Sequence, residues 1–146
     1  MVLVGIDPGA QGAYITLDEN GTLLNYAVFS NWMTAARFLK SLKEQEHLVT
    51  LEKVGAALGN SGKSAFTFGA NYGGWLALLE VMGIAFVLVP PQAWQPKMLG
   101  RFAKGESKKA ANAYVVRRYP QLASLKVKEQ GVADAICMAL YTLKHK

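Results

Sequence analysis

The N-terminal stretch from Val2 to Gly12, VLVGIDPGAQG, constrains the fold of this chain most. The apolar and small residues before Asp7 indicate a buried strand, and the charge of Asp7 marks the end of that strand. Pro8 and Gly9 follow at once and allow the backbone to turn tightly. The pattern predicts a carboxylate that is held beside a glycine-rich loop, where it can bind a cation. The alternative is that Asp7 only opens a turn, as Asp before Pro-Gly commonly does.

Length and composition predict one globular domain over residues 1–146. The residues are 51% hydrophobic and 18% charged, and no segment has the composition of a disordered chain. The single cysteine, Cys137, excludes an intramolecular disulfide and favours a cytoplasmic location, and it leaves a bacterial, phage-encoded or organellar origin open. The most apolar stretch, from Trp75 to Val89, contains Glu80 and Gly83, so we expect no membrane span.

The chain is basic, with a formal net charge of +6 and a pI of about 9.5. A polyanionic partner is favoured, because each neutralised phosphate releases counterions. Many basic proteins bind no polyanion, so the positions of the lysines matter more than their number.

The first half of the chain predicts three strands, a helix and a fourth strand. Asn20-Gly21 between strand-like runs at 13–17 and 22–29 indicates a hairpin, and hence an antiparallel meander with the first strand. Asn31 or Ser30 can cap a helix that extends to about Glu46. Residues 47–54 follow as a strand in which Glu52 is the one acidic residue.

The second half predicts a loop at 55–63, a long helix at about 64–82, a strand at 84–89, a loop up to Ser107, and helices at 107–119 and 132–144. Gly69 and Gly73 share one face of the long helix, where they would allow either tight packing on the sheet or a dimer contact. This order of elements predicts an α/β fold with a mixed five-stranded sheet flanked by helices.

Three acids then lie at element ends or in apolar surroundings: Asp7, Glu52 and Asp134. If the first and fourth strands are neighbours, Asp7 and Glu52 come within reach of one cation, and Mg²⁺ prefers such oxygen ligands. Two cations a few ångströms apart can activate a water and stabilise the leaving oxygen of a phosphodiester.

Several segments together resemble the RuvC-type Holliday junction resolvases, in particular their bacteriophage-like and short bacterial members. These segments are IDPGAQGA, LEKVGA, FTFGANYGG, VPPQAWQ, KGESKKAANAYVVRRYP and GVADAICMALY, and they span nearly the whole chain in order. The resemblance implies an RNase H-like fold and a homodimer. It also implies paired, Mg²⁺-dependent nicks that resolve four-way DNA junctions in recombination and repair, with Mn²⁺ as a substitute ion.

Residue by residue, the resemblance implies catalytic and metal-binding roles for Asp7, Glu52 and Asp134. The family usually has a further acid shortly before the last one, often as Asp-Gly, where this chain has Gln130-Gly131. Three possibilities follow: a variant that uses three acids, a site completed by Gln130 or by Glu129, or a weakened protein that still binds junctions. A His common near position 55 is also absent, because this chain has Gly55 there.

The resemblance also suggests DNA contacts. Lys108 and Lys109 lie near a helix N-terminus, where family lysines meet the phosphate backbone, although a solvated face is the plain alternative. Weaker candidates for phosphate contact are Lys63, Lys97, Arg101 and Lys104. Phe66 and Phe68 could stack on unpaired bases at a junction centre, although aromatic residues at this spacing more often belong to a core.

Two function classes compete with a crossover junction endodeoxyribonuclease. One is a junction-binding protein that has lost cleavage. The other is an actin-like sugar kinase or chaperone ATPase, which also begins with a strand, an Asp and a Gly-rich hairpin. Such enzymes enclose the nucleotide between two domains, which 146 residues cannot supply.

Overall fold

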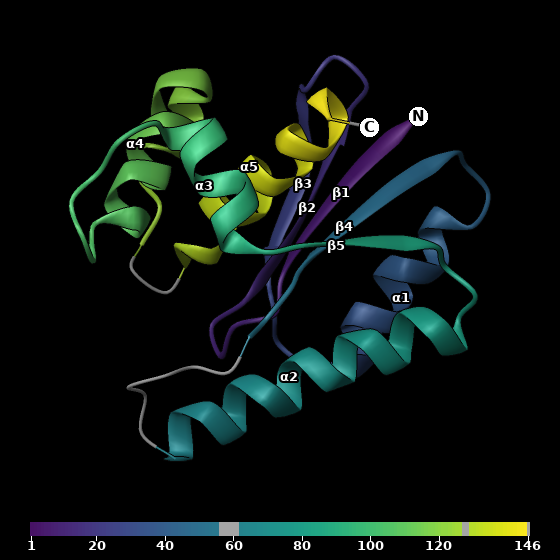
Figure 1. Cartoon of the computed structure of the whole chain (residues 1–146). Helices are drawn as coiled ribbons and strands as arrows, with labels where there is room; N and C mark the ends of the chain where they lie inside the picture. Colours follow the sequence, from purple (N-terminus) through teal and green to yellow (C-terminus); the bar gives the residue numbers. More distant parts are fainter. Residues whose placement is uncertain (56–61, 127–128, 146) are drawn as a thin grey trace.

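The structure, a computed structural model of the chain, describes residues 1–55, 62–126 and 129–145. Within these residues, a five-stranded sheet has the strand order β3-β2-β1-β4-β5 (Figure 1). Its strands are β1 (Val2–Asp7), β2 (Ala13–Asp18), β3 (Leu23–Val28), β4 (His47–Glu52) and β5 (Phe86–Val89). The first three strands pair antiparallel, whereas β1, β4 and β5 run parallel. The predicted mixed sheet and its hairpin are therefore confirmed.

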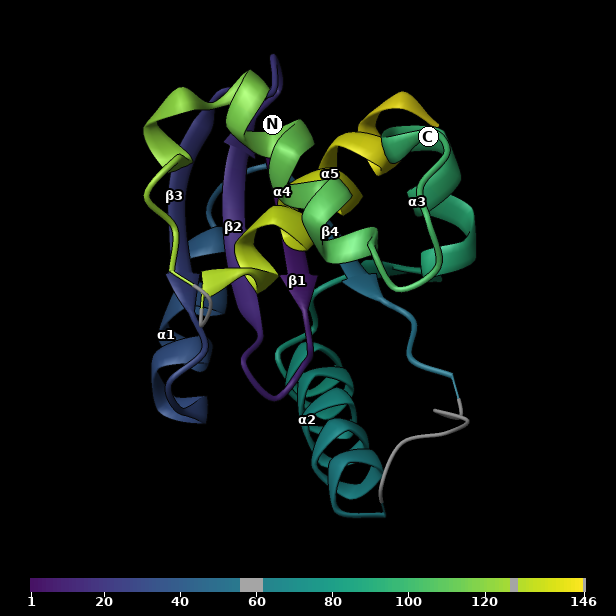
Figure 2. The ribbon, with the colours of Figure 1, turned by 90° about the vertical axis from the view of Figure 1, so that its left-hand side faces the viewer.

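Helices cover both faces of the sheet (Figures 1 and 2). On one face lie α1 (Trp32–Leu42) and α2 (Gly62–Val81). On the other face lie α3 (Pro91–Leu99), α4 (Ser107–Arg118), the short 3-10 helix η1 (Pro120–Leu122) and α5 (Gly131–Lys144). The sheet thus forms the middle of three layers. No helix in the described part of the chain combines the length and the apolarity that a membrane crossing requires.

Alternation along β1 sends its side chains into two different cores. Val4 and Ile6 pack with α1 and α2, whereas Leu3 packs with α3, α4 and α5. By the same period of two, Gly5 and Asp7 face the α5 layer. The last residue of the buried strand is therefore a carboxylate that points toward α5.

Gly5 is the point where α5 crosses β1. A Cβ atom at this position would collide with the backbone carbonyl of Ala135, so a residue with no side chain is required for the helix to lie this close. The contact places the first turn of α5, which contains Asp134, beside the end of β1.

The predicted loop between β5 and Ser107 is wrong in its first half, because residues 91–99 form α3. Pro91 stands in the first turn of that helix, where a missing N–H costs nothing, but Pro96 lies inside it and disguises the helical pattern. Ser107 is the first helical residue of α4 and not its cap. The cap predicted at Asn31 is confirmed, since its side chain accepts a hydrogen bond from the Thr34 backbone at 2.8 Å.

The expectation that Gly69 and Gly73 allow tight packing on the sheet is also wrong. A Cβ atom at either position would meet no atom of residues 1–55, 62–126 or 129–145 within 4 Å, so neither glycine packs on the sheet. The close approach on α2 occurs instead at Gly74, against the Trp32 ring. The α1 helix ends at Leu42, earlier than the predicted Glu46.

Candidate active site

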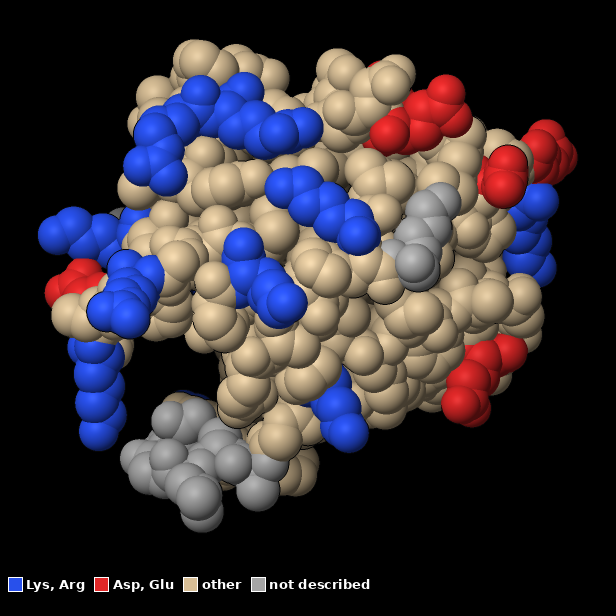
Figure 3. All heavy atoms as spheres, turned by 45° about the horizontal axis from the view of Figure 1, so that its top comes forward, with Lys and Arg blue, Asp and Glu red and all other residues tan. Residues whose placement is uncertain are grey.

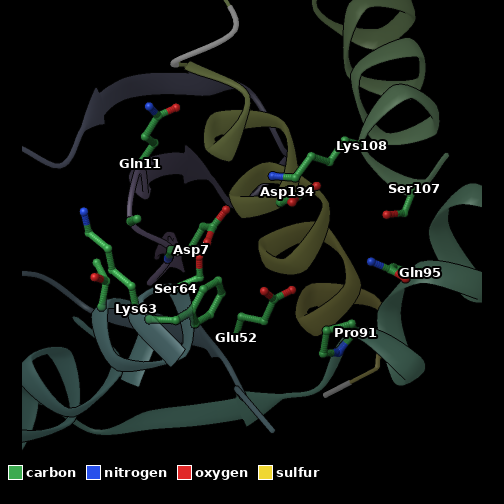
Figure 4. A pocket seen from close by; sticks show the side chains of 14 residues that line it. Asp7, Gln11, Glu52, Lys63, Ser64, Pro91, Gln95, Ser107, Lys108 and Asp134 are labelled. Atoms are coloured by element: carbon green, nitrogen blue, oxygen red, sulfur yellow. Dashed lines mark hydrogen bonds between the residues drawn. The ribbon is translucent and has the colours of Figure 1, made fainter. Parts of the chain in front are cut away.

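A cavity of about 560 Å³ opens at the ends of β1 and β4, between the two helical layers (Figure 4). Its lining includes three acids from separate parts of the chain: Asp7, Glu52 and Asp134. Lys63 from α2 and Lys108 from α4 line it as well. The structure therefore brings the three predicted acids into one pocket together with two of the predicted basic residues.

Asp7 is held by the turn that follows β1. The Gly9 backbone N–H donates to Asp7 Oδ1 at 2.9 Å, and the Gly12 N–H donates to the Gly9 carbonyl at 2.9 Å. Asp7 is 6% exposed. Burial raises the pKa of its carboxyl group, and the Gly9 hydrogen bond and the charge of Lys108 oppose that rise. Asp7 therefore both shapes the turn and faces the pocket.

Glu52 is the last residue of β4 and is 8% exposed. Because Ile6 pairs with Leu51, the parallel register brings Glu52 beside the end of β1. Its Oε2 atom accepts a hydrogen bond from Trp94 Nε1 at 2.9 Å. Burial, followed by repulsion from Asp7, raises the pKa of Glu52 to about 8.

Asp134 lies in the first turn of α5, where a negative charge is favourable to the helix dipole. Burial and then repulsion from Asp7 raise its pKa to about 7, against the opposing charge of Lys108. Lys108 reaches over the pocket beside Asp134, and Gln11 and Lys63 lie on the opposite rim (Figure 4). The lysine thus acts electrostatically on all three acids.

The carboxylate oxygens of these acids are suitable ligands for a divalent cation such as Mg²⁺. Within the described residues, no salt bridge pairs them with a basic side chain. Asp7 repels both Glu52 and Asp134, and a bound cation would relieve this repulsion and stabilise the ionised carboxylates. No three His, Cys, Asp or Glu side chains in the described residues form a ready-made cage for one ion. Mg²⁺ does not need such a cage, since it is usually held by one or two carboxylates, waters and substrate phosphates.

The candidates for a fourth ligand lie outside the pocket lining. Gln130 immediately precedes α5 and does not line the cavity. Glu129 does not line it either, and its Oε1 accepts a hydrogen bond from the Lys126 backbone at 3.1 Å. The residue that approaches Asp7 is Gly131, where a Cβ atom would lie 3.0 Å from Asp7 Oδ2.

The remaining predicted DNA contacts divide into two groups. Phe68 lines the pocket near Gly9, whereas Phe66 is 79% exposed and lies outside the lining. The exposed basic candidates that do not line the pocket are Lys97, Arg101, Lys104 and Lys109. Residues 91–126 contain eight Lys or Arg and only one acidic residue, Glu106. Figure 3 shows basic side chains gathered over the side of α3 and α4, with most acidic ones toward the opposite edge.

Trp94 is a neighbour of the site that sequence reasoning missed, as it missed the lining residues Gln11, Thr67, Gln95 and Ser107. Trp94 fell in a predicted loop, and its bond partner lies 42 residues away in the chain. No local pattern links a tryptophan to a strand-end glutamate at that separation, so the sequence offered no signal for the contact.

Comparison with solved structures shows the fold. Thermus thermophilus RuvC is similar over 99% of this chain and 95% of its own chain, with a TM-score of 0.69 and 20% sequence identity. T. thermophilus RuvC in complex with Holliday junction substrate is similar over the same shares of the two chains, with a TM-score of 0.70 and 19% identity. No family model matches the chain, and no curated protein does. The predicted RNase H-like fold, of the RuvC type, is thereby confirmed.

Proposed function

We propose that this protein is a metal-dependent, structure-specific endonuclease that resolves four-way DNA junctions by paired symmetric nicks. The observation that carries the proposal is the pocket in which Asp7, Glu52 and Asp134 meet beside Lys108. A similar fold in a RuvC structure that contains Holliday junction substrate supports the choice of DNA.

The pocket residues have distinct tasks in this reaction. The carboxylates, one or two to each ion, would hold Mg²⁺, or Mn²⁺ in its place, which when bound supplies Lewis acidity toward a phosphodiester and orients the attacking water. Lys108 would hold the phosphate against the acids by its charge. The products would be a 3′ hydroxyl and a 5′ phosphate.

The basic layer of α3 and α4 supports binding of a polyanion. Its positive charge adjoins the acidic pocket. The basic rim would attract a DNA strand, and one phosphate would then reach the cation held by the acids. Lys109, Lys104, Arg101 and Lys97 are the exposed basic residues proposed to contact phosphates along this surface, and Lys63 and Phe68 would act at the pocket itself.

We expect the active species to be a homodimer, since two matched nicks require two equivalent sites. The exposed side of α2 suits such a contact. Phe66 and Val81 are 79% and 86% exposed, and Gly69 and Gly73 between them leave open space for a partner backbone.

The test is a synthetic four-way junction incubated with the protein and Mg²⁺. We expect symmetric nicks in the wild type and none in Asp7→Asn, Glu52→Gln or Asp134→Asn, with an unbranched duplex of the same sequence left intact. Gel shifts of the variants in EDTA separate lost cleavage from lost binding. Junction cleavage that survives all three substitutions would remove the proposed active site.

A junction-binding protein without cleavage is the second candidate, because neither Gln130 nor Glu129 lines the pocket. In that case the wild type shifts the junction in EDTA but does not nick it with Mg²⁺. Restoration of nicking by Gln130→Asp would then show that one missing carboxylate is responsible.

A further inference from the structure

The hydrogen bond between Trp94 and Glu52 joins α3 to the end of β4. Its length is 2.9 Å from Nε1 to Oε2, and both side chains are buried, with 0% of Trp94 and 8% of Glu52 exposed. A buried indole N–H normally finds a partner, but here the partner is one of the three pocket acids. The bond therefore fixes one oxygen of a carboxylate that lines the cavity.

The position of Trp94 is itself fixed by the sheet. Glu52 pairs with Val89 in the β4–β5 register, and the Lys53 N–H donates to the Val89 carbonyl at 2.9 Å. Pro90 and Pro91 then start α3 at once, so Trp94 enters the core one turn later and packs with Met98. The indole is completely buried, so core packing as well as the hydrogen bond restrains the donor.

The chemistry of the donor suits a site that takes up a cation. An Arg or Lys at this place would neutralise the carboxylate and compete with an incoming ion. The neutral indole N–H can only donate, so it orients Glu52 and adds no positive charge that would compete with the ion. Donors behind a metal ligand typically fix its orientation in this way.

We infer that Trp94 is a positioning residue, which orients the Glu52 carboxylate for a divalent cation bound in the pocket. The inference rests on the proposed function only in that Glu52 is taken as a cation ligand. Trp94 is not among the residues that line the cavity. It acts through Glu52.

Trp94→Phe is the decisive variant, because it keeps an aromatic ring and removes the N–H. Trp75→Phe is the matched control, since Trp75 is 1% exposed in the other core, where it packs against the rings of Tyr14 and Trp32. Isothermal titration of the metal-free proteins with Mn²⁺ should show an affinity about 10-fold weaker for Trp94→Phe and unchanged for Trp75→Phe. Junction binding in EDTA should be the same for both variants and the wild type.

A second measurement uses the wild type alone, in case Trp94→Phe does not fold. In a ¹⁵N–¹H spectrum, the indole resonance of Trp94 should shift on titration with Mg²⁺, while that of Trp75 should not. Wild-type Mn²⁺ affinity in a folded Trp94→Phe, or a Trp94 resonance that does not respond to Mg²⁺, overturns the inference. Failure of the wild type to bind or nick a junction, with the metal effects intact, overturns the proposed function and leaves the role of Trp94 standing.

Discussion

At the scale of single residues, the acids of the pocket are held where their charges are unfavourable. Burial and mutual repulsion raise the pKa of Glu52 to about 8 and that of Asp134 to about 7, well above the value of about 4 that such groups have in an unfolded chain. The fold keeps these acids at a cost to its own stability, as is common at functional sites.

This cost predicts how stability depends on pH in the metal-free protein. Because the folded pKa values lie above the unfolded ones, the favourable contribution is complete below about pH 4 and is lost as the pH rises to about 8. Glu52→Gln should therefore raise the free energy of unfolding at pH 8 by an amount on the order of 1–3 kcal/mol. Urea unfolding in EDTA between pH 5 and 8 measures both the pH dependence of the wild type and the effect of the substitution. A wild type that becomes more stable over this range would contradict the prediction.

The close approach of Gly131 to Asp7 predicts that a side chain at position 131 lowers both stability and cleavage. A Cβ atom there would lie 3.0 Å from Asp7 Oδ2 and 3.0 Å from the Gln11 carbonyl, so Gly131→Ala must displace the acid or the turn. We expect a loss of about 1–3 kcal/mol in unfolding free energy, as for overpacked sites, together with loss of nicking. Gly55→Ala is the control, since a Cβ atom at Gly55 meets no atom of the described residues within 4 Å. If the two variants are equally stable in urea unfolding, the Asp7 side chain and the turn can shift without loss of unfolding free energy, which contradicts the prediction.

At the scale of elements, the sequence predicted the parts of the fold whose signals are local. The run that ends at Asp7, the Asn20-Gly21 hairpin and the apolar face of α5 each follow from neighbouring residues, and all are present. The α3 helix was missed because Pro96 breaks its pattern. The contacts of Trp94 and Gly131 depend on segments distant in the chain, so only the assembled fold reveals them.

A hydrogen bond between β4 and α5 predicts that substitutions of its two residues have non-additive effects on stability. Thr50 on β4 donates to the Thr142 hydroxyl on α5 at 2.8 Å, and both residues are buried. Thr50→Val should cost about 1–3 kcal/mol, because it leaves the Thr142 hydroxyl without its donor. Adding Thr142→Val should recover much of that loss. Thermal unfolding of both single variants and the double variant measures the coupling, and strictly additive losses would mean that the hydroxyl pair contributes nothing of its own.

At the scale of the whole molecule, charge and apolar exposure lie in different places. The basic layer of α3 and α4 borders one side of the acidic pocket, whereas the exposed small and apolar residues of α2 lie on the opposite helical layer. Under the proposed function, one surface would hold DNA and the other would meet a second copy of the chain.

This separation predicts that dimerisation and folding can be uncoupled. Gly73→Arg should convert the proposed dimer to a folded monomer, because a Cβ atom at Gly73 meets no atom of the described residues within 4 Å, whereas the long arginine side chain would obstruct a partner helix. Sedimentation velocity gives the mass, and circular dichroism checks the fold. The control is Arg37→Ala. Arg37 is an exposed residue of α1, and its substitution should leave the mass unchanged. A wild type that sediments as a monomer at all concentrations would rule out the dimer.

The bare backbone at Gly5 has a consequence for how this protein can be altered. The main chain of β1 at Gly5 lies directly against the main chain of α5 at Ala135, and this contact brings Asp7 and Asp134 together. Asp134 could therefore be exchanged for another ligand without loss of the backbone contact that aligns the two positions, whereas Asp7 is also needed to hold the turn after β1. A single methyl group at position 5 would push α5 away from β1 and change the distance between any ligands at positions 7 and 134.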